Sequence, residues 1–113
     1  MLPNKRRIRK TEFSELLSKG AFGASPLFTI RFISSKKDEK STFAVVVSKK
    51  VASSAVARNK IKRNCYHVLR DLSPKVKNSY KIIFFVKKGV EKLSFKDLSS
   101  EIHSALARNR LID

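Results

Sequence analysis

The sequence predicts one α+β domain in which helices pack on a sheet. Two observations carry this prediction. Segments with apolar residues at helical spacing alternate with short runs rich in β-branched and aromatic residues, and no repeat or low-complexity stretch interrupts them. The 113 residues, 42% of them hydrophobic, suit a single core. We therefore expect residues 1–113 to form one domain with elements in the order αβββαβα, one of the strands being short.

The first expected helix begins at Thr11, whose hydroxyl suits a helix N-cap, and ends at Gly20. Glu12 and Glu15 lie in its first turns, where the helix dipole favours acidic side chains. Its apolar face comprises Phe13, Leu16 and Leu17. This pattern is typical of a short amphipathic helix.

Two extended runs follow, Leu27–Ile33 and Thr42–Ser48, both rich in β-branched and aromatic residues. The polar stretch 34–40 separates them, so we expect a hairpin with a mobile loop. A short additional strand is expected near residues 49–52.

The next helix follows directly and is unusually basic. One side of its helical wheel is apolar and comprises Ile61, Cys65, Val68, Leu69 and Leu72. The opposite side comprises Asn59, Lys62, Arg63, Tyr66 and Arg70. Between Lys49 and Arg70 there are seven Lys or Arg residues and no acidic residue. One side of this helix is thus suited to packing and the other to anions.

Two further elements complete the chain. Ser73-Pro74 ends the basic helix, and the nearly all-apolar run Tyr80–Val86 is typical of a buried strand that stops before Gly89. A last helix is expected from Ser94, with Asp97 three residues on as a capping partner. Its apolar positions are Leu98, Ile102, Ala105 and Leu106.

The charge of the chain indicates its partner. There are 26 Lys or Arg against 9 Asp or Glu, which gives a formal net charge of +17. Such a surface attracts polyanions, and phosphate contacts release the counterions condensed on a nucleic acid. A basic face that merely keeps the protein in solution is the alternative for the helix taken alone. The balance of the whole chain favours RNA.

Other classes of protein are disfavoured. No stretch approaches the roughly 20 apolar residues of a membrane span, and the N-terminus runs into the basic cluster 5–10 without the apolar region of a secretory signal. We therefore expect a cytoplasmic protein. The single cysteine, Cys65, lies on the apolar stripe and is expected to be a buried, unreactive thiol. The nine acids are scattered, and His67 and His103 form no evident catalytic pair, so no protein-borne nuclease site is expected.

The run Val47-Ser48-Lys49-Lys50, followed by Arg58-Asn59-Lys60-Ile61-Lys62-Arg63, resembles the signature of the bacterial ribonuclease P protein subunit. In that family the helix usually reads R-N-R-x-K-R-x-x-R after an Ala-Val pair. Here Ala55-Val56 stands in place, and the identical positions are Arg58, Asn59, Lys62 and Arg63. The likeness covers nearly the whole chain, since three other segments also fall where the family has them: Glu12-Phe13 through Gly20, Ser25-Pro26-Leu27-Phe28, and the Tyr80 strand.

Three positions depart from the family pattern. Lys60 replaces the usual second Arg, which keeps the charge but gives up bidentate phosphate geometry. Tyr66 replaces the usual last Arg, exchanging a cation for a ring that can stack on a base or bond to a phosphate. Ser53-Ser54 replaces a Gly-containing turn, so that loop is expected to differ in shape.

The resemblance implies a fold and a function. The fold is an α/β sandwich with a mixed sheet of about four strands and three helices, similar to a ribosomal-protein domain. The function is that of a small protein beside a large catalytic RNA, the pair removing the 5′ leader of precursor tRNA by Mg²⁺-dependent hydrolysis. The RNA holds the active site, and the protein is expected to be monomeric, one copy per RNA.

The resemblance also implies site residues. Contacts to the catalytic RNA are expected from Ser48, Lys49, Lys50, Arg58, Asn59, Lys60, Lys62 and Arg63. Asn59 is also expected to order metal-bound water, an indirect metal role. Contacts to the single-stranded leader are expected from Phe13, Phe28, Arg31 and Tyr66, because aromatic rings stack on unpaired bases of any sequence. For Phe13 and Phe28 a place in the core is the alternative. Residues 1–10 are expected to form a flexible basic arm, which either adds salt-sensitive affinity or is simply solvated.

Three other functions are weighed against this one. A ribosomal or ribosome-assembly protein would share composition and fold class, but the Arg58–Arg63 motif separates the two. A stand-alone nuclease would need a carboxylate cluster or a histidine pair. A DNA-binding helix would need the preceding short helix and turn of a helix-turn-helix unit, which is missing here.

Overall fold

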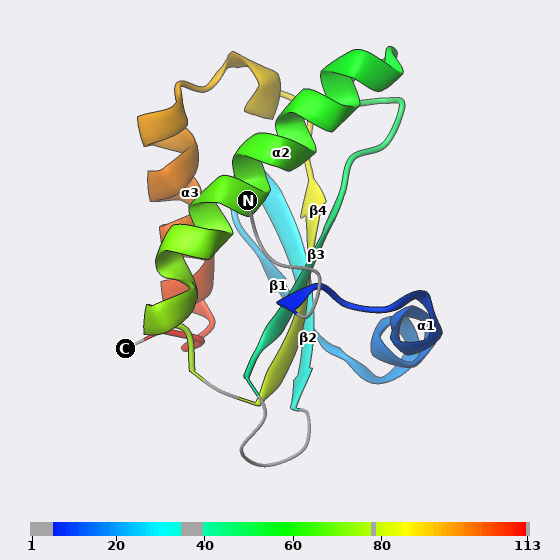
Figure 1. The fold of residues 1–113 in the computed structure, drawn as a ribbon, viewed down its shortest axis with the longest axis vertical. Coiled ribbons are helices and arrows are strands. Elements are labelled where there is room, and N and C mark those ends of the chain that lie inside the picture. The colour runs from blue at the N-terminus through cyan, green and yellow to red at the C-terminus, as the bar shows by residue number, and fades with distance from the viewer. Residues whose placement is uncertain (1–5, 35–39, 78, 113) are drawn as a thin grey trace.

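The computed structural model describes residues 6–34, 40–77 and 79–112. Its elements confirm the α+β class and the order αβββαβα. In chain order they are α1 (Lys10–Lys19), β1 (Ala21–Ala24), β2 (Phe28–Ser34), β3 (Thr42–Val46), α2 (Ala55–Leu72), β4 (Tyr80–Val86) and α3 (Phe95–Arg108), with short 3₁₀ turns at Ser73–Lys75 and Val90–Lys92. Figure 1 shows α2 and α3 side by side across the sheet, with α1 set apart from them.

The sheet is mixed, with strand order β1-β2-β4-β3. Its two antiparallel pairs are β1 with β2 and β2 with β4, whereas β3 runs parallel to β4. The prediction that β2 and β3 form a hairpin is therefore wrong, because β4 lies between these two strands in the sheet. A parallel pair needs a long crossover, and α2 provides it between β3 and β4.

The short strand was expected in the wrong place. Residues 49–51 form a turn, in which the amides of Val51 and Ala52 both donate to the carbonyl of Ser48 at 3.1 and 3.3 Å. The remaining strand is instead β1, whose sequence Ala-Phe-Gly-Ala has little β propensity. It pairs with β2 immediately after α1 ends.

The helix ends follow the expected chemistry with one exception. The cap residue of α1 is Arg9, so Thr11 lies inside the first turn and the prediction of a Thr11 cap is wrong. The amide of Arg9 donates to the Glu12 carboxylate at 3.1 Å, which anchors this end. Gly20 ends the helix as expected. A larger residue would not fit at this position, because its Cβ would lie 2.4 Å from the Leu16 carbonyl oxygen. Ser94 caps α3 as expected, accepting from the amide of Asp97 at 3.1 Å.

Most of the core lies between the sheet and the pair α2 and α3. The expected apolar positions of both helices are buried, which confirms the helical stripes. Cys65 is fully buried among them, and burial raises the pKa of its thiol to about 12. A second, smaller cluster on the other face of the sheet consists of Leu16, Ala44 and Ile83, with α1 packed on it.

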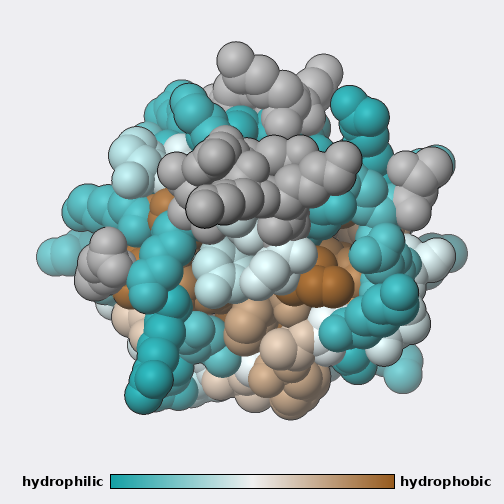
Figure 2. Space-filling view, turned by 90° about the horizontal axis from the view of Figure 1, so that it is seen from below, coloured by the Kyte–Doolittle hydropathy of each residue, from teal (hydrophilic) through white to brown (hydrophobic). Residues whose placement is uncertain are grey.

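The surface is strongly polar. Seen from below in Figure 2, hydrophilic residues lie on both sides of an apolar area that reaches the lower edge of the view. Within the described ranges, none of the helices combines the length and hydropathy that crossing a membrane would require.

Candidate RNA-binding site

The outer side of α2 presents the basic residues singled out in the sequence. Ser54 caps the helix, accepting from the amide of Ala57 at 3.0 Å, and the first turn carries no acidic residue. The side chains of Asn59, Lys60 and Arg63 are exposed, and Lys62 is half-buried. None of these three cations forms a hydrogen bond or ion pair with another described residue. Their charge is therefore available to an external anion.

Arg58 has a different local role from its neighbours. Its Nη1 donates to the carbonyls of Ala52 and Ser53 at 3.0 and 2.8 Å. These bonds hold the segment before α2 against its first turn. The expected contact residues Ser48, Lys49 and Lys50 lie in this preceding segment with exposed side chains. The structure thus brings the Val47–Lys50 run close to the Arg58–Arg63 run, at the N-terminal end of α2.

Two of the four expected leader contacts lie on the face of the sheet that carries α1. Phe13 is half-buried beside the smaller cluster. Arg31 is half-buried on β2, where its Nη1 donates to the Leu17 carbonyl at 3.1 Å. Its guanidinium lies 5.8 Å from the ring centroid of Phe22, a residue that is 62% exposed. An aromatic ring, a cation and the exposed Leu17 side chain therefore share this face.

Phe28, an expected leader contact for which the core was the alternative, lies in the core. Its side chain is fully buried, and its ring packs edge-on to Phe84 with centroids 5.9 Å apart. Successive strand residues point to opposite faces, so Phe28 and Ile30 face α2 and α3, whereas Arg31 faces the α1 side. The exposed aromatic residue of this region is Phe22 of β1, which the sequence reasoning missed because β1 itself was not expected.

Tyr66, another expected leader contact, lies on the opposite face of the sheet from Phe13 and Arg31. Its ring packs against the main core, and its hydroxyl accepts from the amide of Val45 at 3.2 Å. The reason is that Tyr66 belongs to α2, the helix that covers the opposite face of the sheet. Tyr66 lies next to β3, which is an edge strand of the sheet.

The same outer edge of β3 holds the N-terminal segment. The amide of Ile8 donates to the Phe43 carbonyl at 2.9 Å, and Arg6 Nε donates to the Ser41 carbonyl at 2.9 Å. Burial also lowers the pKa of Arg6. Within the expected arm, Arg6–Ile8 therefore have backbone partners on the sheet, because an unpaired strand edge offers them to a neighbouring chain segment. The rest of the expected arm before Arg6 lies outside the described residues.

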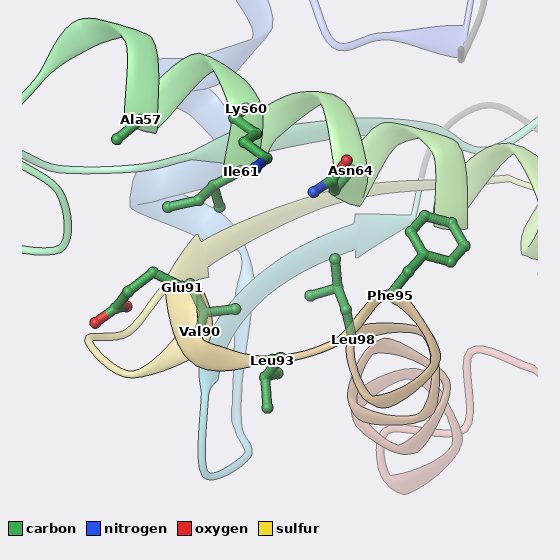
Figure 3. Close-up of a pocket in the computed structure, with 9 residues that line it drawn as sticks. All are labelled: Ala57, Lys60, Ile61, Asn64, Val90, Glu91, Leu93, Phe95 and Leu98. Atoms are coloured by element: carbon green, nitrogen blue, oxygen red, sulfur yellow. The ribbon is translucent and has the colours of Figure 1, made fainter.

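A groove of about 360 Å³ separates α2 from the start of α3. Figure 3 shows Asn64 pointing from α2 toward Leu98 and Ile61 pointing to the Val90 side of the groove, with Phe95 at one end and the Glu91 carboxylate turned away. Lys60 also lines this groove, which therefore begins next to the basic side of the helix.

Comparison with known proteins identifies the family. A sequence model of the family described as Ribonuclease P matches residues 2–110. The chain belongs to the ribonuclease P protein family. It is 27% identical to the ribonuclease P protein component of Pseudanabaena sp. (strain PCC 6903), over 99% of this chain and 97% of that one. It is 29% identical to the corresponding protein of Streptococcus pyogenes serotype M5, over 93% and 86% of the two chains.

Solved ribonuclease P proteins have the same fold. The Staphylococcus aureus protein superposes with a TM-score of 0.84 at 21% identity, over 96% of this chain and 98% of that one. The Thermotoga maritima protein gives a TM-score of 0.81 at 21% identity, over 90% and 96%. Family membership makes the chain a protein component of the ribonuclease P ribonucleoprotein and implies RNA binding and tRNA processing.

Two acidic residues of this ribonuclease P protein form ion pairs with basic side chains. Glu12 forms an ion pair with Lys81 that links α1 to β4, and this partner holds the pKa of the Glu12 carboxyl below its usual range. Asp71 pairs with Arg70 at 3.3 Å on the exposed surface. Throughout the described ranges, no three His, Cys, Asp or Glu side chains group together in a way that could hold a metal ion.

Proposed function

We propose that this protein binds the catalytic RNA of ribonuclease P through the outer side of α2 and supports removal of the 5′ leader of precursor tRNA. The active site belongs to the RNA, and the protein acts as one copy per RNA in the cytoplasm. The observation that carries the proposal is the set of unpaired cations on α2 next to the exposed turn at Ser48–Lys50.

The α2 surface suits a folded RNA because its cations lie on one side of a rigid helix. Lys62 and Arg63 sit about one turn beyond Asn59, so their side chains can follow successive phosphates. The Arg58 bonds to Ala52 and Ser53 keep the preceding turn in place, so Lys49 and Lys50 extend the same track. Preorganised cations lose less conformational entropy on binding than those of a free tail.

The face that carries α1 suits a single strand. Arg31 is fixed by its bond to the Leu17 carbonyl and lies beside the exposed ring of Phe22. Rings that stack on bases accept any sequence, and an adjacent cation neutralises the backbone. We assign the leader to this face, with Phe22 taking the place expected for Phe28 and with Phe13 at its border.

Mg²⁺ enters this proposal through the RNA. Among the described residues, no three His, Cys, Asp or Glu side chains lie together in a group that could hold an ion. When bound by the RNA, Mg²⁺ supplies an activated water and stabilises the charge that develops on the cleaved phosphodiester. The protein contributes the exposed amide of Asn59, whose oxygen and nitrogen can accept from and donate to water around an ion held by the RNA.

The test is reconstitution of cleavage. The protein is added to the ribonuclease P RNA of the Pseudanabaena strain and a precursor tRNA at low Mg²⁺, and release of the 5′ leader is followed on a gel. Cleavage is expected only when RNA and protein are both present. Absence of stimulation would refute the proposal, and cleavage by the protein alone would place an active site in the protein.

A further inference from the structure

The N-terminal segment delivers an arginine to α2 from outside the helix. Arg7 forms an isolated parallel bridge with Phe43, and the next amide, that of Ile8, donates to the Phe43 carbonyl at 2.9 Å. These contacts fix the backbone of Arg7 on the outer edge of β3. The Arg7 guanidinium lies 4.4 Å from the ring centroid of Tyr66. This distance is short for a cation over an aromatic ring.

The ring beneath this guanidinium is also fixed. The Tyr66 hydroxyl accepts from the amide of Val45 at 3.2 Å, two residues along β3 from the Phe43 carbonyl that holds Ile8. Both members of the stack are therefore anchored to the same strand. The position of the cation relative to α2 follows from these anchors rather than from the flexibility of a long side chain.

The donors of Arg7 are not used within the described structure. Three other arginines each donate to a backbone carbonyl: Arg6, Arg31 and Arg58. Arg7 forms no hydrogen bond or ion pair with a described residue, and its Nε is buried without a partner. Arg7 as a whole is only half-buried, and its two terminal nitrogens are not buried, so these donors are suited to an acceptor that arrives from outside.

The location of the stack identifies the acceptor. Tyr66 lies four residues beyond Lys62 and three beyond Arg63, so it continues the basic side of α2 by one turn. Tyrosine brings no charge to this position, where the resemblance described above leads one to expect arginine. The guanidinium of Arg7 restores a cation there.

We propose that Arg7 and Tyr66 form a phosphate-binding site for the RNA, in which Arg7 contacts the phosphate and Tyr66 is the positioning residue. The site extends the α2 track beyond Arg63 to the edge of β3. It rests on the proposed function, because it requires α2 to lie on RNA. It adds a contact from a segment far from α2 in the chain.

The first test is the salt dependence of binding to the Pseudanabaena ribonuclease P RNA. Arg7→Ala is expected to weaken binding about tenfold near 0.15 M salt, as loss of a charged hydrogen bond does, and to lower the slope of log K against log salt by just under one. Arg7→Gln keeps most of the side chain and is expected to give the same loss of slope. The matched control is Arg108→Ala, which removes an exposed arginine from α3 and is expected to change affinity less than twofold.

The positioning role is tested by moving the charge. Tyr66→Phe keeps the ring but removes its bond to Val45, so it is expected to weaken binding less than Tyr66→Ala, which is expected to match Arg7→Ala. Combining Arg7→Ala with Tyr66→Arg returns the cation to the helix, and we expect it to restore the lost slope and most of the affinity. A merely structural role for Arg7 would predict a lower melting temperature, an unchanged slope and no rescue.

One further variant separates this inference from the proposed function. Arg63→Ala removes a cation of α2 itself and is expected to lower the slope by about one. If Arg63→Ala lowers the slope while Arg7→Ala and Arg7→Gln leave both slope and affinity unchanged, the Arg7 site is refuted and the α2 surface stands. If neither position affects the slope, the proposed α2 surface fails as well.

Discussion

The two faces of the sheet are covered to very different extents. One face lies under α2 and α3, which bury most of the strand residues that point toward them, including Phe28 and Ile30. On the other face, α1 and Ile8 pack against the sheet, and they leave Arg31 half-buried and Phe22 largely exposed. Phe28 and Arg31 are three residues apart on one strand, yet only the second can meet a ligand. Access to RNA is thus decided by which helices cover a face, more than by residue type.

The largest test of this contrast concerns stability. Phe28→Ala is expected to lower the free energy of unfolding by about 3–5 kcal/mol, because it leaves a cavity in the covered core. Phe22→Ala is the matched control on the open face, and we expect it to cost less than about 1 kcal/mol. Urea denaturation measures both. Equal losses would contradict the assignment of the two faces.

The next test concerns the leader. Phe22→Ala is expected to weaken binding of precursor tRNA by the reconstituted enzyme by about 1–3 kcal/mol, the value of one stacked base. Binding of mature tRNA, which lacks the leader, should stay the same. The comparison uses equilibrium titrations of both tRNAs. An equal loss for the two would remove Phe22 from the leader surface.

A third test concerns the outer side of α2. Arg63→Ala should weaken binding of the catalytic RNA about tenfold, since it removes one charge-assisted bond to phosphate. Stability should be unaffected, because the side chain is exposed and unpaired. Filter binding and thermal unfolding report the two quantities. A fall in melting temperature equal to the loss of affinity would indicate a structural role instead.

The smallest expected effect concerns the join between α1 and the sheet. The pKa of Glu12 is lowered in the folded state by Lys81, so its contribution to stability is complete above the unfolded pKa and is lost as pH falls through the folded value. Glu12→Gln is expected to lower stability near pH 7 by less than about 1 kcal/mol and to flatten the decline below about pH 4.5. Urea titrations between pH 3 and pH 7 test this, and an unchanged pH profile would contradict it.

Local patterns predicted much of this fold. The apolar stripe of α2, the bounds of β4 and the Ser94 cap depend on residues close in sequence, and all three are confirmed. Strand pairing depends on contacts far apart in the chain. Nothing in the polar stretch 34–40 indicates that β4 separates β2 from β3.

The candidate site also contains residues that could be predicted from the sequence and residues that could not. The α2 cations could be singled out because a motif of adjacent residues encodes them, and the structure places them on an exposed side. The choice between Phe22 and Phe28 depends on which face each strand residue points to, which requires the sheet and its covering helices. The basic sequence before Lys10 is typical of a solvated tail, and only the unpaired edge of β3 explains why Arg6–Ile8 dock there.

The burial of Cys65 gives the protein an internal reporter. A thiol with a pKa of about 12 is almost wholly protonated at neutral pH, and no solvent reaches it while α2 stays on the sheet. Alkylating reagents can therefore modify it only when α2 lifts away, so the rate of modification measures that opening. Because the cations proposed to bind RNA belong to the same helix, RNA held by α2 should slow the modification of a thiol that it does not touch.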